Sequence, residues 1–163
     1  MAGLMEAYNP FFFEEPVPPD NVAEMARVST AINIPVATGE RLYTRWMFRE
    51  LLESQAADYI QPDLCHCGGF NEGRKIAAMA ETYHVRVLPH NPNGPISTLV
   101  GVHFGACTAN FEMLEYAHRD PDSVPLLLHM PEVKDGHIEI PNRPGWGVEV
   151  DEAVLAQLPM ETE

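Results

Sequence analysis

Short runs of apolar residues alternate with segments of helical periodicity along the first 115 positions of the chain. The first run, Phe11-Phe12-Phe13, is wholly aromatic, which is typical of a strand buried on both faces. Alternation of short buried strands with helices predicts an α/β fold with a parallel sheet, either doubly wound or part of a barrel. Strands are predicted at 11–13, 34–37, 59–61, 85–88 and 111–114, and helices at 22–32, 45–53, 72–83 and 96–107, after a helix end at 1–9. Asp20 is the expected N-cap of the helix at 22–32.

The pattern changes after Glu115. Residues 133–140 predict a hairpin, because Asp135-Gly136 is a favoured two-residue turn. Residues 141–147 are rich in proline and glycine, and a final short helix is expected at 151–158. No low-complexity linker divides the chain, so the pattern alone indicates no internal domain boundary.

The composition is that of an ordinary globular protein, with 45% apolar and 21% charged residues. The 24 acidic side chains outnumber the 10 lysines and arginines and give a net charge of −14, which argues against nucleic acid or an anionic membrane as partner. Three cysteines fit a reducing compartment better than a secreted disulfide framework. Because neither a long apolar stretch nor a signal peptide is seen, the sequence is interpreted as a soluble cytoplasmic protein.

An ionisable residue follows each predicted strand. These residues are Glu14, Glu40, Asp63, His90 and Glu115, at intervals of 23 to 27 residues. One interpretation is that strand ends are exposed and therefore polar. The other is that the five side chains converge on one mouth of a parallel barrel, where carboxylates suit a cation such as Mg2+. A histidine held by an aspartate there can act as a general base.

The motifs around these residues resemble one family. Phe-Glu-Glu-Pro at 13–16, Thr-Gly-Glu-Arg at 38–41, Gln-Pro-Asp at 61–63 with Gly68-Gly69, Pro-His at 89–90 and Leu-Glu at 114–115 occur in the order seen in the mandelate racemase/muconate lactonizing enzyme family of the enolase superfamily. The segments 61–66, 78–83 and 90–95, with the Pro-Gly-x-Gly pattern at 144–147, are most similar to its galactonate dehydratase-like acid-sugar dehydratases. The resemblance extends from about Phe11 to Leu158.

The resemblance implies a role for each strand-end residue. Glu14 and Glu40 would be ligands of Mg2+, and His90, paired with Asp63, would abstract the proton alpha to the carboxylate of a sugar acid. Glu115 would hydrogen-bond the substrate carboxylate or the enediolate. Loss of a hydroxyl group from the neighbouring carbon would then complete a dehydration, so the activity implied is that of a hydro-lyase.

The resemblance also implies that the chain is the C-terminal part of a longer enzyme. Residues 1–118 would supply strands four to eight of a TIM-type barrel, and residues 119–163 a hairpin and tail that pack on an absent capping domain. The family's third metal ligand, its lysine motif and its second histidine are not found in the sequence. The 163-residue chain alone is therefore expected to be poorly soluble and inactive, and the full-length protein is expected to form a homo-oligomer.

Two other functions stay open: a racemase or epimerase of the same superfamily, which would share the five residues, and a non-catalytic remnant of the fold. Cys65-His66-Cys67 lacks the spacing of a zinc site. Glu15 is interpreted as structural, and Arg41 as a contact of either the substrate or a nearby acid. Cys107 and Met113 are expected in the core.

Overall fold

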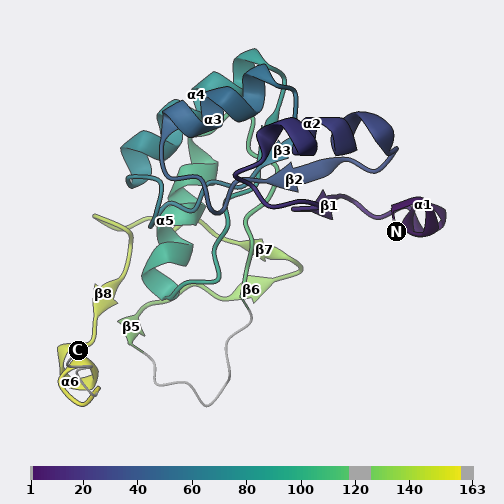
Figure 1. Ribbon diagram of the computed structural model, residues 1–163. Coiled ribbons are helices and arrows are strands. Elements are labelled where there is room, and N and C mark those ends of the chain that lie inside the picture. Colours follow the sequence, from purple (N-terminus) through teal and green to yellow (C-terminus); the bar gives the residue numbers. More distant parts are fainter. Residues whose placement is uncertain (1, 118–125, 159–163) are drawn as a thin grey trace.

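The described part of the chain, residues 2–117 and 126–158, is built around a sheet of four parallel strands in this computed structural model (Figure 1). The strands are β1 (Phe13–Glu14), β2 (Val36–Thr38), β3 (Tyr59–Ile60) and β4 (Arg86–Val87), in spatial order β1-β2-β3-β4. Phe13 pairs with Val36, Ala37 with Tyr59, and Tyr59 with Arg86. The predicted parallel sheet is therefore confirmed, with each strand next to its neighbour in sequence.

Helices connect the strands. They are α2 (Val22–Ala31), α3 (Arg45–Glu53), α4 (Phe70–Thr82) and α5 (Pro95–Ala106), preceded by α1 (Ala2–Met5) and the 3-10 turn η1 (Glu6–Tyr8). In Figure 1, α2, α3 and α4 lie on one side of the sheet. Their apolar faces form a core with the strands, in which Met25, Phe48 and Ile76 are fully buried. The burial of these apolar side chains is the main favourable contribution to folding, and it holds the strand ends in place.

The C-terminal part forms two small antiparallel ladders. Strand β5 (Leu127–Leu128) pairs with β8 (Glu149–Val150), and β6 (Val133–Lys134) pairs with β7 (His137–Ile138). The predicted hairpin is confirmed, since Asp135 and Gly136 both have positive φ, 50° and 75°, as a type I′ turn requires. The last helix, α6 (Glu152–Leu155), is shorter than predicted and is capped by the side chain of Asp151.

Two strand predictions are corrected. The first strand begins at Phe13, and Phe11 is 49% exposed rather than buried on both faces. The reason is that β1 is an edge strand of the described sheet, so that Phe11 and Phe12 pack instead against the ring of Tyr59. The segment 111–114 is not a strand, because only Phe111 forms a bridge to β4, through Val87.

Three local predictions are also wrong. Helix α2 is capped by Asn21, whose side chain accepts a hydrogen bond from the Glu24 amide at 3.1 Å, and not by Asp20. Cys107 is exposed, because α5 ends at Ala106 and Cys107 is the C-cap that follows it. Met113 is 43% exposed, since the segment that carries it lies at the outer side of β4.

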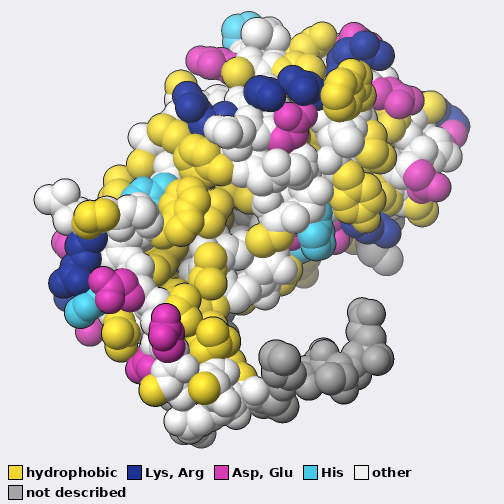
Figure 2. Space-filling model, turned by 90° about the vertical axis from the view of Figure 1, so that its left-hand side faces the viewer, with side chains coloured by type: hydrophobic (Ala, Val, Ile, Leu, Met, Phe, Trp, Pro, Cys, Tyr) yellow, Lys and Arg dark blue, Asp and Glu magenta, His cyan; other side chains and the backbone are white. Residues whose placement is uncertain are grey.

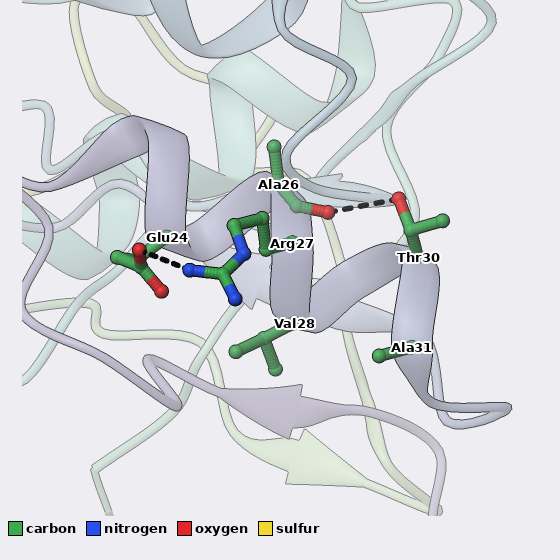
Figure 3. A pocket seen from close by; sticks show the side chains of 6 residues that line it. All are labelled: Glu24, Ala26, Arg27, Val28, Thr30 and Ala31. Carbon is green, nitrogen blue, oxygen red and sulfur yellow. Dashed lines mark hydrogen bonds and ion pairs between the residues drawn. The ribbon is translucent and has the colours of Figure 1, made fainter.

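The surface of the described residues shows two further features. A shallow open depression lies along α2, where Glu24 pairs with Arg27 and the Thr30 hydroxyl donates to the Ala26 carbonyl (Figure 3). Figure 2 shows that apolar side chains are spread over one face among charged ones. No helix in residues 2–117 or 126–158 has the length and apolar character needed to cross a membrane.

Candidate active site at the strand ends

The carboxyl ends of β2, β3 and β4 bring their polar residues to one edge of the sheet. His90 lies at the centre, 3.0 Å from Asp63 through Nδ1. Its Nε2 lies 3.2 Å from Glu40 and 3.9 Å from Glu115. Glu14, at the end of β1, joins this group through Gln61, whose side-chain amide donates to it at 2.7 Å. The structure thus brings Glu40, Asp63 and Glu115 around His90, and Glu14 is connected to them only indirectly, through the segment that carries Gln61 and Asp63.

Asp63 fixes one ring nitrogen of His90, and the other faces the carboxylates of Glu40 and Glu115. Because Asp63 is an acceptor at Nδ1, the neutral ring carries its proton there and presents an Nε2 lone pair. Nε2 is directed at Glu40 and Glu115, and the His90 side chain is 18% exposed. A ligand can therefore reach Nε2, which is the geometry of a general base.

Asp63 is fully buried, and its hydrogen bonds keep it ionised. Burial raises the pKa of Asp63, but hydrogen bonds from the Asn93 side chain, the Cys65 amide and His90 together lower this pKa below its ordinary value. The Cys65 amide donates to Oδ1 at 2.7 Å and Asn93 Nδ2 donates to Oδ2 at 2.9 Å. An anionic Asp63 stabilises the positive charge that His90 gains when it takes up a proton.

Glu14 and Glu40 follow neighbouring strands and offer the hard oxygen donors that Mg2+ prefers. Glu40 is placed by Gly39, whose φ of 135° is poorly accessible to other residues and whose position leaves no room for a side chain beside Phe48. Within residues 2–117 and 126–158, no group of three or more histidine, cysteine or acidic side chains is arranged to hold a metal. The two carboxylates thus fit part of a magnesium ligand set, not a whole one.

Glu15 and Arg41 form an ion pair beside the two candidate ligands. Glu15 accepts hydrogen bonds from the Arg41 guanidinium and, at 3.2 Å, from the Thr38 hydroxyl. The hydrogen bond to Glu15 raises the pKa of Arg41. These contacts tie the end of β1 to the end of β2, next to Glu14 and Glu40. The sequence predicted that Arg41 contacts either the substrate or a nearby acid, and the structure shows the contact with an acid, Glu15.

The Cys65-His66-Cys67 segment lies beside the active site, and within the described residues it forms no metal site of its own. Cys67 is 1% exposed, and burial, with the nearby charge of Asp63, raises the pKa of its thiol to about 11. Cys65 contacts the Ser97 hydroxyl through sulfur at 3.3 Å. His66 is exposed and lies 3.6 Å from Asp63. The two sulfur atoms thus have separate surroundings, one buried and one exposed.

The site contains three residues for which the sequence predicted no role. Gln61 binds Glu14, Asn93 binds Asp63, and the backbone amide of Asn91 donates to Glu115 at 2.7 Å. All three lie in motifs that carry the family resemblance. The sequence feature that could have identified them is a neutral polar residue one to three positions from a strand-end ionisable residue. A residue at that distance can join the same hydrogen-bond network.

Comparison with known proteins decides the family. Residues 1–154 match the family described as enolase C-terminal domain-like. The chain belongs to this family. This match confirms the resemblance to the enolase superfamily. It also confirms the predicted fold class, an α/β fold from the C-terminal part of the superfamily's barrel.

Individual relatives carry names of acid-sugar enzymes. The chain is 34% identical to the D-galactonate dehydratase of Ralstonia pickettii, over 94% of this chain and 42% of that protein. It is 37% identical to the D-xylonate dehydratase of Haloferax volcanii, over 97% of this chain and 39% of that protein. The crystal structure of an enolase from Agrobacterium radiobacter with bound Na and L-malate superposes with a TM-score of 0.90 at 40% identity, over 95% of this chain and 43% of that one. The chain thus spans about two fifths of the length of the proteins it matches.

Proposed function

We propose that the protein containing this chain is a sugar-acid dehydratase in which His90 abstracts the proton alpha to the substrate carboxylate. The observation that carries the proposal is the 3.0 Å contact between His90 and Asp63, with Nε2 directed at Glu40 and Glu115. The relatives named as D-galactonate and D-xylonate dehydratases support this class of substrate. Such acids carry a hydroxyl group on the carbon next to the one that loses the proton.

The residues of the chain would divide the chemistry as follows. His90 Nε2 takes the alpha proton, while Asp63 holds the ring in the correct tautomer and stabilises its positive charge. Glu115, fixed by the amide of Asn91, hydrogen-bonds the enediolate. The C–O bond on the neighbouring carbon then breaks as its hydroxyl group takes up a proton, from protonated His90 or from an acid outside this chain, and leaves as water. The resulting enol tautomerises to a 2-keto acid.

Glu14 and Glu40 would hold Mg2+ together with at least one further ligand. When bound, the ion supplies electrostatic stabilisation of the negative charge that develops on the substrate carboxylate. The chain itself presents two carboxylates from adjacent strand ends. Gln61 holds the carboxylate of Glu14, and the backbone conformation of Gly39 places Glu40.

The same proposal assigns residues 1–118 to the barrel and residues 119–163 to a tail that packs on a capping domain. Support comes from the inner side of the tail, where the Trp146 carbonyl lies 3.2 Å from His103 Nε2 and the Trp146 ring packs on Phe70. These contacts fix Trp146 on α4 and α5, and 38% of Trp146 remains exposed in the described structure, where a further domain could cover it.

The test is an assay of the complete gene product that carries this sequence. The enzyme is incubated with a panel of sugar acids, and 2-keto acid is detected as its semicarbazone. We expect one or a few acids to be dehydrated, and His90→Asn to lower kcat by about 10²- to 10⁴-fold, the usual contribution of a general base. His84→Asn is the matched control, because His84 is exposed and its φ of 60° is one that asparagine tolerates.

Incubation in D2O distinguishes the rival functions. A racemase or epimerase would incorporate deuterium at the alpha carbon without net loss of water. A non-catalytic protein would show neither exchange nor keto acid. Either result, or full activity of His90→Asn, would contradict the proposal.

A further inference from the structure

Gln61 is a buried polar residue between the two halves of the site. It follows β3 directly, is 6% exposed, and its backbone amide donates to the Thr38 carbonyl at 2.9 Å. Its side-chain Nε2 donates to Glu14 at 2.7 Å. Two residues later the same segment supplies Asp63. Gln61 therefore joins the candidate metal ligand on β1 to the segment that orients the base.

The orientation of the Gln61 amide follows from its partner. A carboxylate only accepts hydrogen bonds, so the NH2 group must face Glu14 and the carbonyl oxygen must face away. No donor within residues 2–117 and 126–158 reaches that buried oxygen. A buried amide oxygen without a partner costs about 1–3 kcal/mol. An apolar side chain of similar size would avoid this cost, so the internal packing of the described residues does not explain a glutamine here.

The contact with Glu14 does explain it. The donor on Oε1 restrains the otherwise exposed Glu14 side chain and leaves Oε2 without a contact from Gln61. Replacing a residue that holds a metal-binding carboxylate in this way commonly lowers the affinity for the metal.

We propose that Gln61 is a positioning residue that orients the Glu14 carboxylate for a divalent cation. The inference rests on the proposed function, because it takes Glu14 as a ligand of Mg2+. It predicts that Gln61 acts on metal binding through Glu14, and not on the substrate directly.

The experiment measures Mg2+ binding to the metal-stripped complete gene product by isothermal titration calorimetry. The variants are Gln61→Leu and Gln61→Met, which keep the side-chain size and remove the donor. We expect the dissociation constant to rise about 10- to 100-fold in both, the range typical of residues that support metal ligands. Gln157→Leu is the control, because it makes the same chemical change at an exposed position just after α6, where the Gln157 side chain donates to the Ala153 carbonyl. Circular dichroism confirms folding, and if one variant unfolds, the other carries the test.

A double-mutant cycle identifies the route of the effect. In a Glu14→Gln background, Gln61→Leu should change Mg2+ affinity less than twofold, because the carboxylate that Gln61 orients is already gone. Equal affinity in wild type and both Gln61 variants, or additive effects in the cycle, would overturn this inference and leave the proposed function standing. Failure of the wild-type protein to bind Mg2+ would overturn both.

Discussion

Replacing Asp63 by asparagine is the sharpest perturbation of the His90 pair, because it changes charge and tautomer with almost no change in shape. In the native site Oδ1 accepts from the Cys65 amide at 2.7 Å, and Oδ2 accepts from His90 Nδ1 at 3.0 Å and from Asn93 at 2.9 Å. An asparagine has one oxygen for these three donors. If that oxygen stays with Cys65, its NH2 group faces His90, and the imidazole must move its proton to Nε2.

The expected loss follows from this tautomer. With a proton on Nε2, His90 cannot accept the alpha proton, so kcat of the complete gene product should fall about 10²- to 10⁴-fold. This corresponds to about 2.7–5.4 kcal/mol in the activation barrier. Asn93, which is half-buried, then loses its acceptor, and this lowers the free energy of unfolding by at most about 1–3 kcal/mol. Turnover in steady-state assays and urea unfolding measure the two effects separately.

Asp151→Asn is the matched control for this substitution. Asp151 caps α6 by accepting from the Ala153 and Val154 amides, and asparagine caps a helix equally well. The control should therefore change neither kcat nor stability appreciably. An Asp63→Asn enzyme that kept more than a tenth of the wild-type kcat would refute the assignment of His90 as a base oriented by Asp63.

Three further predictions follow from the same geometry. Because hydrogen bonds lower the pKa of Asp63 in the folded protein, its stabilisation is present above the unfolded pKa of about 3.9 and is lost as the pH falls through the lower folded value. The stability difference between wild type and Asp63→Asn should therefore shrink below about pH 4 in urea unfolding at graded pH, and a constant difference would contradict this. Gly39→Ala places a Cβ 2.8 Å from the Phe48 ring at a φ of 135°, and should lower both stability, by about 1–3 kcal/mol, and kcat. Gly136→Ala, with a φ of 75° but open space around it, is the control for backbone strain alone, and an equal kcat loss there would count against a steric effect at the site. Cys67, with a pKa of about 11 and 1% exposure, should resist iodoacetamide at pH 8 under native conditions, whereas exposed Cys65 reacts, as mass spectrometry of tryptic peptides would show. Rapid labelling of native Cys67 would mean that its segment opens.

Much of the fold was predictable from local pattern. The helix at 45–53 was placed at its observed bounds, and the Asp135-Gly136 turn was recognised from two residues. These features depend on periodicity and on turn chemistry, both of which act over a few positions. The spacing of the strand-end residues also predicted their convergence, because parallel strands end at the same edge of a sheet.

Other features depended on contacts between distant segments. The burial of Phe11 was wrong because the residue's surroundings are set by the place of β1 at the sheet edge and by Tyr59, 48 positions away. The bond between Gln61 and Glu14 joins residues 47 positions apart, and nothing in either local sequence specifies it. The sequence by itself determined which residue types stand at the strand ends and in what order. Only the tertiary structure decided which nitrogen of His90 faces Asp63 and which amide holds Glu14, because a hydrogen bond needs two groups within about 3 Å and the packing of helices on the sheet sets that distance.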